Sequence, residues 1–237
     1  MGKNILLLDN EYPDISDLEE IIKTAICNAK DNTSRELEYQ EDASGAMEYL
    51  LDLKESKKNI SAIIADEHLY SEIGGSDFLR LCRGYLVYLC TKDSRYLNLN
   101  LKKLNDFDSI EKICEKGARV DKEFINFLEN FFKDVKDYVD FVQYFLECNP
   151  LIIMLCGHPT GVDTTGLEDV QLIQKKDGCE YDVLDLLEGY GIFSPQEIEP
   201  VLNNHYRLSD PNNLKKLKYN PSSKHIKKRI KQKKSSY

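Results

Sequence analysis

The sequence predicts an α/β fold in which helices cover both faces of a parallel β-sheet. Three short apolar runs, at 4–8, 60–65 and 151–156, have the length and the unbroken apolar character of strands buried on both sides. Segments with helical spacing of apolar residues lie between them, the first at 15–30 and the second at 43–53. Because strands that alternate with amphipathic helices build parallel βαβ units, we expect a doubly wound sheet.

Two further segments bring the predicted sheet to five strands. Residues 37–40 are a weak strand candidate, and the apolar run at 170–174 is a stronger one that ends at Lys175. Apolar residues at helical spacing, or short helix-favouring stretches, predict three more helices at 77–83, 183–187 and 195–204.

Between residues 84 and 148 the alternation of strand and helix stops. We expect helices at Tyr85–Cys90 and Ile110–Cys114, and one long helical segment over Phe124–Cys148. The Phe and Tyr stripe of the long segment has helical spacing, which is typical of a packed core rather than of a cofactor site. The sequence therefore predicts a helical insertion at 84–148 within an α/β domain formed by 1–83 and 149–204.

Charge separates the last part of the chain from the rest. The net charge of the 237 residues is −9, yet residues 205–237 hold eleven Lys and Arg against one acid, Asp210. We expect this basic tail to be disordered. Its partners could be nucleic-acid phosphates, an acidic protein, an anionic surface or the acidic body of the chain itself.

Composition also bounds the class of protein. No segment approaches the ~20 apolar residues of a membrane span, and the start of the chain turns acidic after Leu8, unlike a secretory signal. The seven cysteines are odd in number and form no CxxC pair, which predicts free thiols in a reducing cytoplasm. We find no support in the sequence for a Ser-His-Asp triad, a P-loop or a GxGxxG dinucleotide loop, which are motifs that would indicate an enzyme.

Four residues follow or close the predicted strands: Asp9, Asp66, Cys156 and Lys175. The carboxyl ends of parallel strands meet at one edge, where sites gather in open α/β sheets. Paired carboxylates attract a hard cation such as Mg²⁺. A carboxylate supported in this way can attack phosphorus, and a nearby lysine can balance the phosphoryl oxygens.

Four segments in chain order resemble the response-regulator receiver domain of two-component signalling. ILLLDNE is similar to its first strand and acidic cluster, and ADEHLYSEIGGSDFLRLCR to its phosphoacceptor strand, loop and third helix. LIIMLCGHP is similar to its fourth strand, and LIQKKDGCEYDVLDLL to its fifth strand, lysine and last helix. The resemblance covers about residues 3–83 and 149–190, and it implies a flavodoxin-like five-stranded sheet.

The resemblance also implies roles for individual residues. Asp66 would be the phosphoacceptor and a ligand of Mg²⁺, Asp9 and Asn10 would fall on the acidic pair that holds the metal, and His68 would offer its backbone carbonyl. Cys156 would take the place of the Thr or Ser that meets the phosphoryl group, and Lys175 that of the lysine that pairs with it. The implied partner is a histidine kinase or a phosphotransfer protein.

The metal position departs from the family pattern. Asn10 stands where the second acid is usual, which removes a negative charge, and Glu11 compensates only if the loop register shifts by one. His68 and His158 fall on two positions that flank the phosphoryl group in the family. Both histidines could instead be rim residues without such a role.

Residues at the positions that the family uses for its conformational switch also differ from the family pattern. Cys156 offers only a weak S–H donor, Leu172 replaces the usual aromatic residue, and Tyr70 and Lys176 replace prolines. The segment at 160–169 is short and rich in Gly and Thr, so we expect the fourth helix to be reduced or absent.

Three interpretations follow from these observations. The first is a receiver that accepts phosphate on Asp66 with Mg²⁺, and the second is a degenerate pseudo-receiver that binds a protein partner without phosphorylation. The third, a phosphatase, lacks the second carboxylate two residues after the nucleophile, since that residue is His68. The sequence favours the first, a signalling domain rather than an enzyme.

Overall fold

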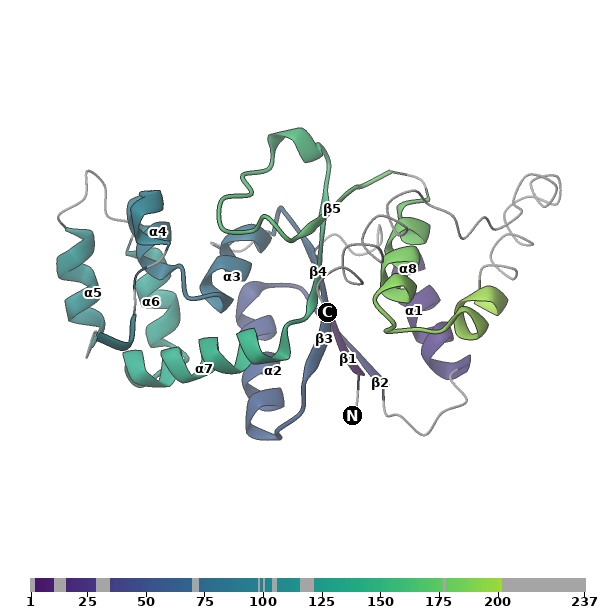
Figure 1. The fold of residues 1–237 in the computed structure, drawn as a ribbon, viewed down its shortest axis with the longest axis horizontal. Helices are drawn as coiled ribbons and strands as arrows, with labels where there is room; N and C mark the ends of the chain where they lie inside the picture. Colours follow the sequence, from purple (N-terminus) through teal and green to yellow (C-terminus); the bar gives the residue numbers. More distant parts are fainter. Residues whose placement is uncertain are drawn as a thin grey trace, which may run out of the picture.

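The structure is a computed structural model, and it describes residues 3–10, 16–28, 35–69, 73–97, 99, 101–103, 106–115, 122–176 and 178–201. Its centre is one sheet of five parallel strands in the order β2-β1-β3-β4-β5. This order and the flanking helices confirm the predicted flavodoxin-like α/β fold (Figure 1). The strands are β1 (Lys3–Leu8), β2 (Arg35–Gln40), β3 (Ile60–Asp66), β4 (Leu151–Cys156) and β5 (Gln171–Gln174).

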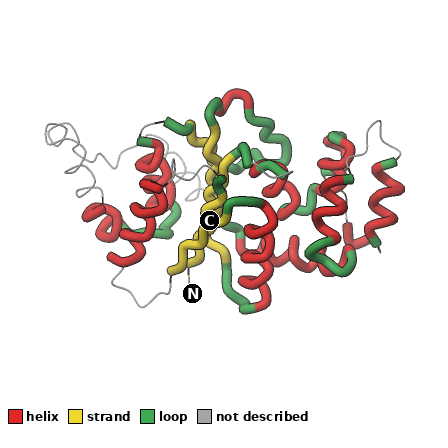
Figure 2. Tube along the Cα trace, turned by 180° about the vertical axis from the view of Figure 1, so that it is seen from behind, coloured by secondary structure: helices red, strands yellow, loops and turns green. Residues whose placement is uncertain are grey.

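Helices cover both faces of the sheet, as Figures 1 and 2 show. On one face lie α1 (Ser16–Asn28), α8 (Cys179–Gly189) and the helical residues 195–201. On the other lie α2 (Ala43–Glu55), α3 (Gly75–Cys82) and α7 (Val135–Cys148). The remaining helices extend outward from this second face. They are α4 (Leu86–Thr91), η1 (Ser94–Tyr96), η2 (Leu101–Lys103), α5 (Phe107–Cys114) and α6 (Glu123–Glu129).

The alternation of side chains along the strands creates two cores. Ile5 and Leu7 point into the layer with α1 and α8, whereas Leu6 and Leu8 point into the layer with α2 and α3. All four side chains are fully buried, which explains why Ile5–Leu8 contains no polar residue. The second core continues without a break from the sheet to Phe141 of α7, so the helices at 84–148 share the buried surface of the α/β body.

The helical segment expected over Phe124–Cys148 is in fact two helices, and that prediction was wrong. Helix α6 ends at Glu129, with Asn130 as its C-cap, and α7 begins after Asp134, whose Oδ1 accepts a hydrogen bond of 3.0 Å from the backbone N–H of Asp137. An N-cap of this kind satisfies an N–H that the first turn leaves without a partner. The apolar spacing runs through the break because Phe131 and Phe132 still pack inward.

Replacing Asp134 with Ala is expected to destabilise the protein by about 1 kcal/mol, because the N–H of Asp137 loses its acceptor. Thermal or urea unfolding followed by circular dichroism measures this loss. Asp140→Ala is the matched control, since Asp140 is an exposed residue within the same helix. An equal effect of both substitutions would contradict the capping role.

The connection between β4 and β5 contains no α-helix. Its only regular element is a 3-10 turn, η3 (Pro159–Gly161), which agrees with the expectation that the fourth helix is reduced or absent. The connection spans 157–170 and is called the β4–β5 loop below. Helices α2, α3 and α7 therefore cover this face of the sheet without a helix that belongs to the last crossover.

Some predictions fall outside the described residues. The basic tail at 205–237, Glu11 and Tyr70 lie there, and the division into domain, insertion and tail stays a prediction. Within the described part of the chain, no helix has the length and apolar character needed to cross a bilayer.

Candidate functional site

Three of the four residues singled out at the strand ends meet at the carboxyl edge of the sheet. The ammonium nitrogen of Lys175 lies 3.0 Å from Asp9 Oδ2 and 2.9 Å from Asp66 Oδ2. Lys175 follows β5 and reaches across β4, because β4 lies between β5 and β3 in the sheet. The residues come from three strands that are far apart in sequence, so the fold itself creates this cluster.

Burial strengthens the charge interactions within the cluster. Asp9 is 0% exposed and Asp66 is 3% exposed, whereas the side chain of Lys175 is 22% exposed. Burial raises the pKa of Asp66, and the hydrogen bond from Lys175 opposes this rise without cancelling it. For Lys175, burial alone would lower the pKa, but its hydrogen bonds to Asp66 and Asp9 outweigh burial and raise it.

Backbone contacts fix the two aspartates in place. The N–H of Asp9 donates to the carbonyl of Gln40, 3.1 Å away, and the hydroxyl of Tyr39 donates to the carbonyl of Asp9 over 2.7 Å. The backbone N–H of His68 hydrogen-bonds the carboxylate of Asp66 and so favours its ionised form. The backbone of Asp9 and the carboxylate of Asp66 are therefore positioned by neighbouring backbone and side-chain groups at the strand ends.

Hard oxygen atoms dominate the site, which fits a small divalent cation. Asp9 and Asp66 supply carboxylates. Both polar side-chain atoms of Asn10 are buried without a hydrogen-bond partner among the described residues, so its amide oxygen is open to a ligand. In the same part of the chain, no group of three or more His, Cys, Asp or Glu gathers to hold a metal. A metal here would thus depend on the two aspartates, Asn10 and solvent.

Cys156 lies at the end of β4, as predicted, but its thiol faces backbone. The residue is 1% exposed, and its Sγ donates to the carbonyl of Ile173 on β5, 3.5 Å away. Burial first, and then the charges of Glu67 and Asp66, raise its pKa, so the thiol stays neutral. Leu172 is partly buried against the core.

The two histidines considered for the site are both exposed. His68 lies two residues after the end of β3, and His158 follows β4. The carbonyl role of His68 toward a metal, and any role of His158 near a phosphoryl group, stay predictions.

The structure adds two residues that the sequence did not single out. Gly75 begins α3 so close to β3 that a Cβ at this position would lie 1.9 Å from the carbonyl oxygen of Asp66. Glu67 accepts a hydrogen bond of 3.1 Å from the hydroxyl of Ser76. The Gly74-Gly75 pair was a visible signal for the first, whereas nothing in the local sequence indicates the second.

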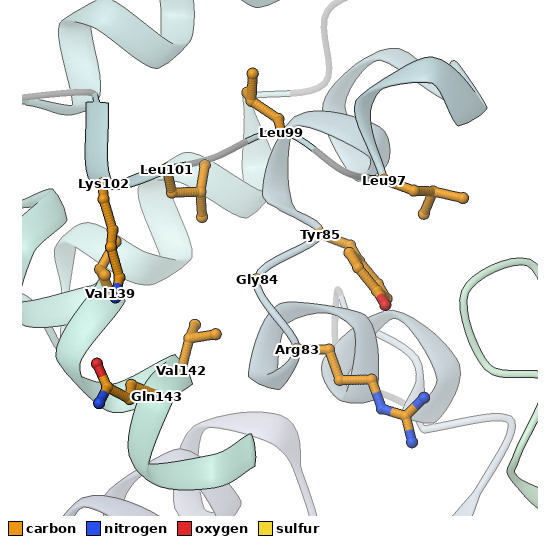
Figure 3. A pocket seen from close by; sticks show the side chains of 10 residues that line it. All are labelled: Arg83, Gly84, Tyr85, Leu97, Leu99, Leu101, Lys102, Val139, Val142 and Gln143. Carbon is orange, nitrogen blue, oxygen red and sulfur yellow. The ribbon is translucent and has the colours of Figure 1, made fainter. Parts of the chain in front are cut away.

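A cavity of about 170 Å³ lies away from this cluster and is lined by residues between 83 and 143 (Figure 3). Figure 3 shows Leu101 and Val142 pointing toward one another across it, with Lys102 and Gln143 at its side. Its walls are mainly aliphatic, and it contains none of Asp9, Asp66 or Lys175. The cluster of Asp9, Asp66 and Lys175 is thus separate from this cavity.

Comparison with known proteins adds no relative to this description: no family model, no curated protein and no solved structure matches the chain.

Proposed function

We propose that the chain is a receiver domain in which Asp66 accepts a phosphoryl group from a phosphohistidine of a histidine kinase or phosphotransfer protein. The observation that carries the proposal is the contact of Lys175 with Asp9 and Asp66, at 3.0 and 2.9 Å, at the carboxyl edge of a flavodoxin-like sheet. A nucleophile, a second carboxylate and a charge-balancing amine are the groups that this chemistry needs.

In the proposed reaction a carboxylate oxygen of Asp66 attacks phosphorus while the P–N bond of the phosphohistidine breaks. The electron pair of that bond returns to the imidazole nitrogen, which takes up a proton. Lys175 already faces Asp66 and would balance the charge of the phosphoryl oxygens. Mg²⁺, held by Asp9, Asp66 and the amide oxygen of Asn10, would neutralise phosphoryl charge when bound. A cytoplasmic location accords with this proposal, since all seven cysteines are free thiols.

Incubation with acetyl phosphate and Mg²⁺ is expected to add one phosphoryl group to the wild type and none to Asp66→Asn, because the amide is not a nucleophile. Intact mass spectrometry measures the addition. Beryllofluoride with Mg²⁺ should likewise shift the amide NMR signals of the wild type alone. Asp140→Asn, a change at an exposed residue of α7, should label like the wild type. The proposal would be refuted if, at millimolar Mg²⁺, the wild type neither gains a phosphoryl group from acetyl phosphate nor shifts its amide NMR signals with beryllofluoride.

A second candidate is a pseudo-receiver that binds a protein partner without phosphorylation. The thiol of Cys156 is engaged with the carbonyl of Ile173, and the β4–β5 loop has no helix, so two parts of the usual family switch are altered. This candidate is expected to bind no Mg²⁺ in the low millimolar range and to keep partner binding in Asp66→Ala. Titration of Mg²⁺ followed by NMR separates the two candidates.

A further inference from the structure

The β4–β5 loop is held by a buried arginine of α3 rather than by a helix of its own. Arg80 is 2% exposed, and its guanidinium donates to the carbonyls of Thr165 and Asp163, at 3.1 and 2.6 Å. It also pairs with the carboxylate of Asp163 at 3.2 Å. A guanidinium has a planar fork of donors, so one side chain fixes two peptide groups of the loop at once.

A second arginine strengthens the same contact. One turn further along, Arg83 donates to the carbonyl of Gly166 at 3.1 Å and forms a bidentate pair with Asp169 at 2.7 and 3.0 Å. Its guanidinium extends away from Leu101 and Val142 in Figure 3. Residues 163–169 of the loop are therefore held by two arginines one turn apart, Arg80 in α3 and Arg83 at its C-cap.

The same helix is fastened to the strand end that carries Asp66. Gly75 leaves no room between α3 and the carbonyl of Asp66, and its N–H donates to the carbonyl of Glu67 at 3.2 Å. The side chains continue this contact: Arg80 donates to the hydroxyl of Ser76 at 3.2 Å, and that hydroxyl donates to Glu67 at 3.1 Å. An unbroken chain of contacts thus joins the residue after Asp66 to the loop.

The chain of contacts ends at Tyr88 of α4. Tyr88 of α4 donates from its hydroxyl to the carboxylate of Asp163 at 3.1 Å, and the guanidinium of Arg80 lies 5.7 Å from the centre of its ring. Tyr88 is 5% exposed. The loop, α3 and α4 therefore meet around one buried cation.

We propose that α3 transmits the state of the Asp66 site to the β4–β5 loop and to α4, and that Arg80 is the residue that joins them. A ligand on Asp66, or a change of its charge, displaces the end of β3. The first turn of α3 follows, because Gly75 is in contact with that strand end, and Arg80 moves the two carbonyls that it binds. The route through α3 takes the place of a route through Cys156, whose thiol is engaged with β5.

The inference rests on the proposed function for its ligand, but its test does not. The site is perturbed in two ways: beryllofluoride with Mg²⁺ in the wild type, and Asp66→Asn without any ligand. Hydrogen exchange of the full chain, read by mass spectrometry, reports on residues 157–170 and 86–91. We expect at least one perturbation to change exchange of both segments by about fivefold or more.

The coupling variants are Ser76→Ala and Arg80→Lys, each combined with both perturbations. Arg95→Lys is the matched control, since Arg95 is exposed and pairs only with nearby Asp93 among the contacts described. In the coupling variants the change at 157–170 should fall below about twofold, while the change around Asp66 persists. Ser76→Ala removes one hydroxyl and keeps Arg80, so it remains informative if Arg80→Lys folds poorly.

The outcomes separate the two proposals. A response of 157–170 that survives unchanged in Ser76→Ala overturns the coupling through α3, as does the absence of any response of this segment to both perturbations in the wild type. If 157–170 responds to Asp66→Asn while beryllofluoride changes exchange neither there nor around Asp66, the coupling is supported and the phosphoacceptor proposal is refuted.

Discussion

Lys175→Met is expected to unfold more easily than the wild type by about 3 kcal/mol at neutral pH, because the substitution leaves Asp9 and Asp66 buried without their shared cation. Methionine has nearly the length of lysine and preserves most of its packing, so the change isolates the charge. Urea unfolding at several pH values measures the loss. Lys176→Met is the matched control, since the neighbouring lysine is exposed.

The loss in Lys175→Met should depend on pH in a defined direction. Burial and the charge of Asp9 both raise the pKa of Asp66, and the variant removes the lysine that opposes them. A carboxyl whose pKa is higher in the folded than in the unfolded protein holds its proton more tightly when folded. The variant is therefore closest to the wild type below the unfolded-state pKa of about 4, loses stability as pH rises from there to the raised pKa of Asp66, and shows the full loss above it.

A double substitution tests the cause. Asp9→Asn combined with Lys175→Met removes one of the two charges that lack a partner, so it should recover part of the lost stability at neutral pH. Lys175→Met that remains as stable as the wild type at every pH would show that water, rather than Lys175, compensates the two carboxylates.

Gly75→Ala is expected to have the second large effect, a loss of about 3 kcal/mol together with loss of beryllofluoride binding. The new Cβ would lie 1.9 Å from the carbonyl oxygen of Asp66, and backbone atoms cannot turn aside as a side chain can. Either α3 or the end of β3 must move, and both determine where the carboxylate of Asp66 lies. Thermal unfolding and titration with beryllofluoride and Mg²⁺ measure the two effects.

Two other glycines provide a graded comparison for Gly75→Ala. A Cβ at Gly74 would lie 3.1 Å from the carbonyl of Glu67, so Gly74→Ala should have an intermediate effect. Gly161 has open space around it, so Gly161→Ala should be close to neutral. Equal stability of the three variants would contradict the close approach of α3 to β3.

The sequence predicted the sheet well because its central strands are buried on both faces. Ile5–Leu8, Ile60–Ala65 and Leu151–Cys156 carry almost no polar residue, and only a central parallel strand combines such a run with this length. The edge strand β2 was a weak candidate because its side chains are only partly buried, so its sequence, RELEYQ, is mostly polar. Burial on both faces thus made the central strands easier to predict than β2.

The cluster of Asp9, Asp66 and Lys175 was predictable because strand ends share one edge whatever the loops do. The environment of Arg80 was not. Its burial depends on loop carbonyls at 163 and 165, more than 80 positions away, and no local pattern encodes that contact. The break before α7 lay between these cases, since Asp134 followed by Asp137 is a helix-start signal that the continuous aromatic stripe obscured.

The helices at 84–148 separate β3 from β4 in the sequence, and this separation affects how the sheet folds. Strands β3 and β4 pair in register, yet more than 80 residues separate Asp66 from Leu151. Loop-closure entropy rises only by about 0.6 kcal/mol for each doubling of loop length, so the insertion costs the finished sheet little. Folding rate is more sensitive, because pairing across a long separation is slow. The hydrogen bonds of helices α4 to α7 are local, so we expect these helices to form early and to shorten the stretch of chain that the pairing of β3 with β4 must close.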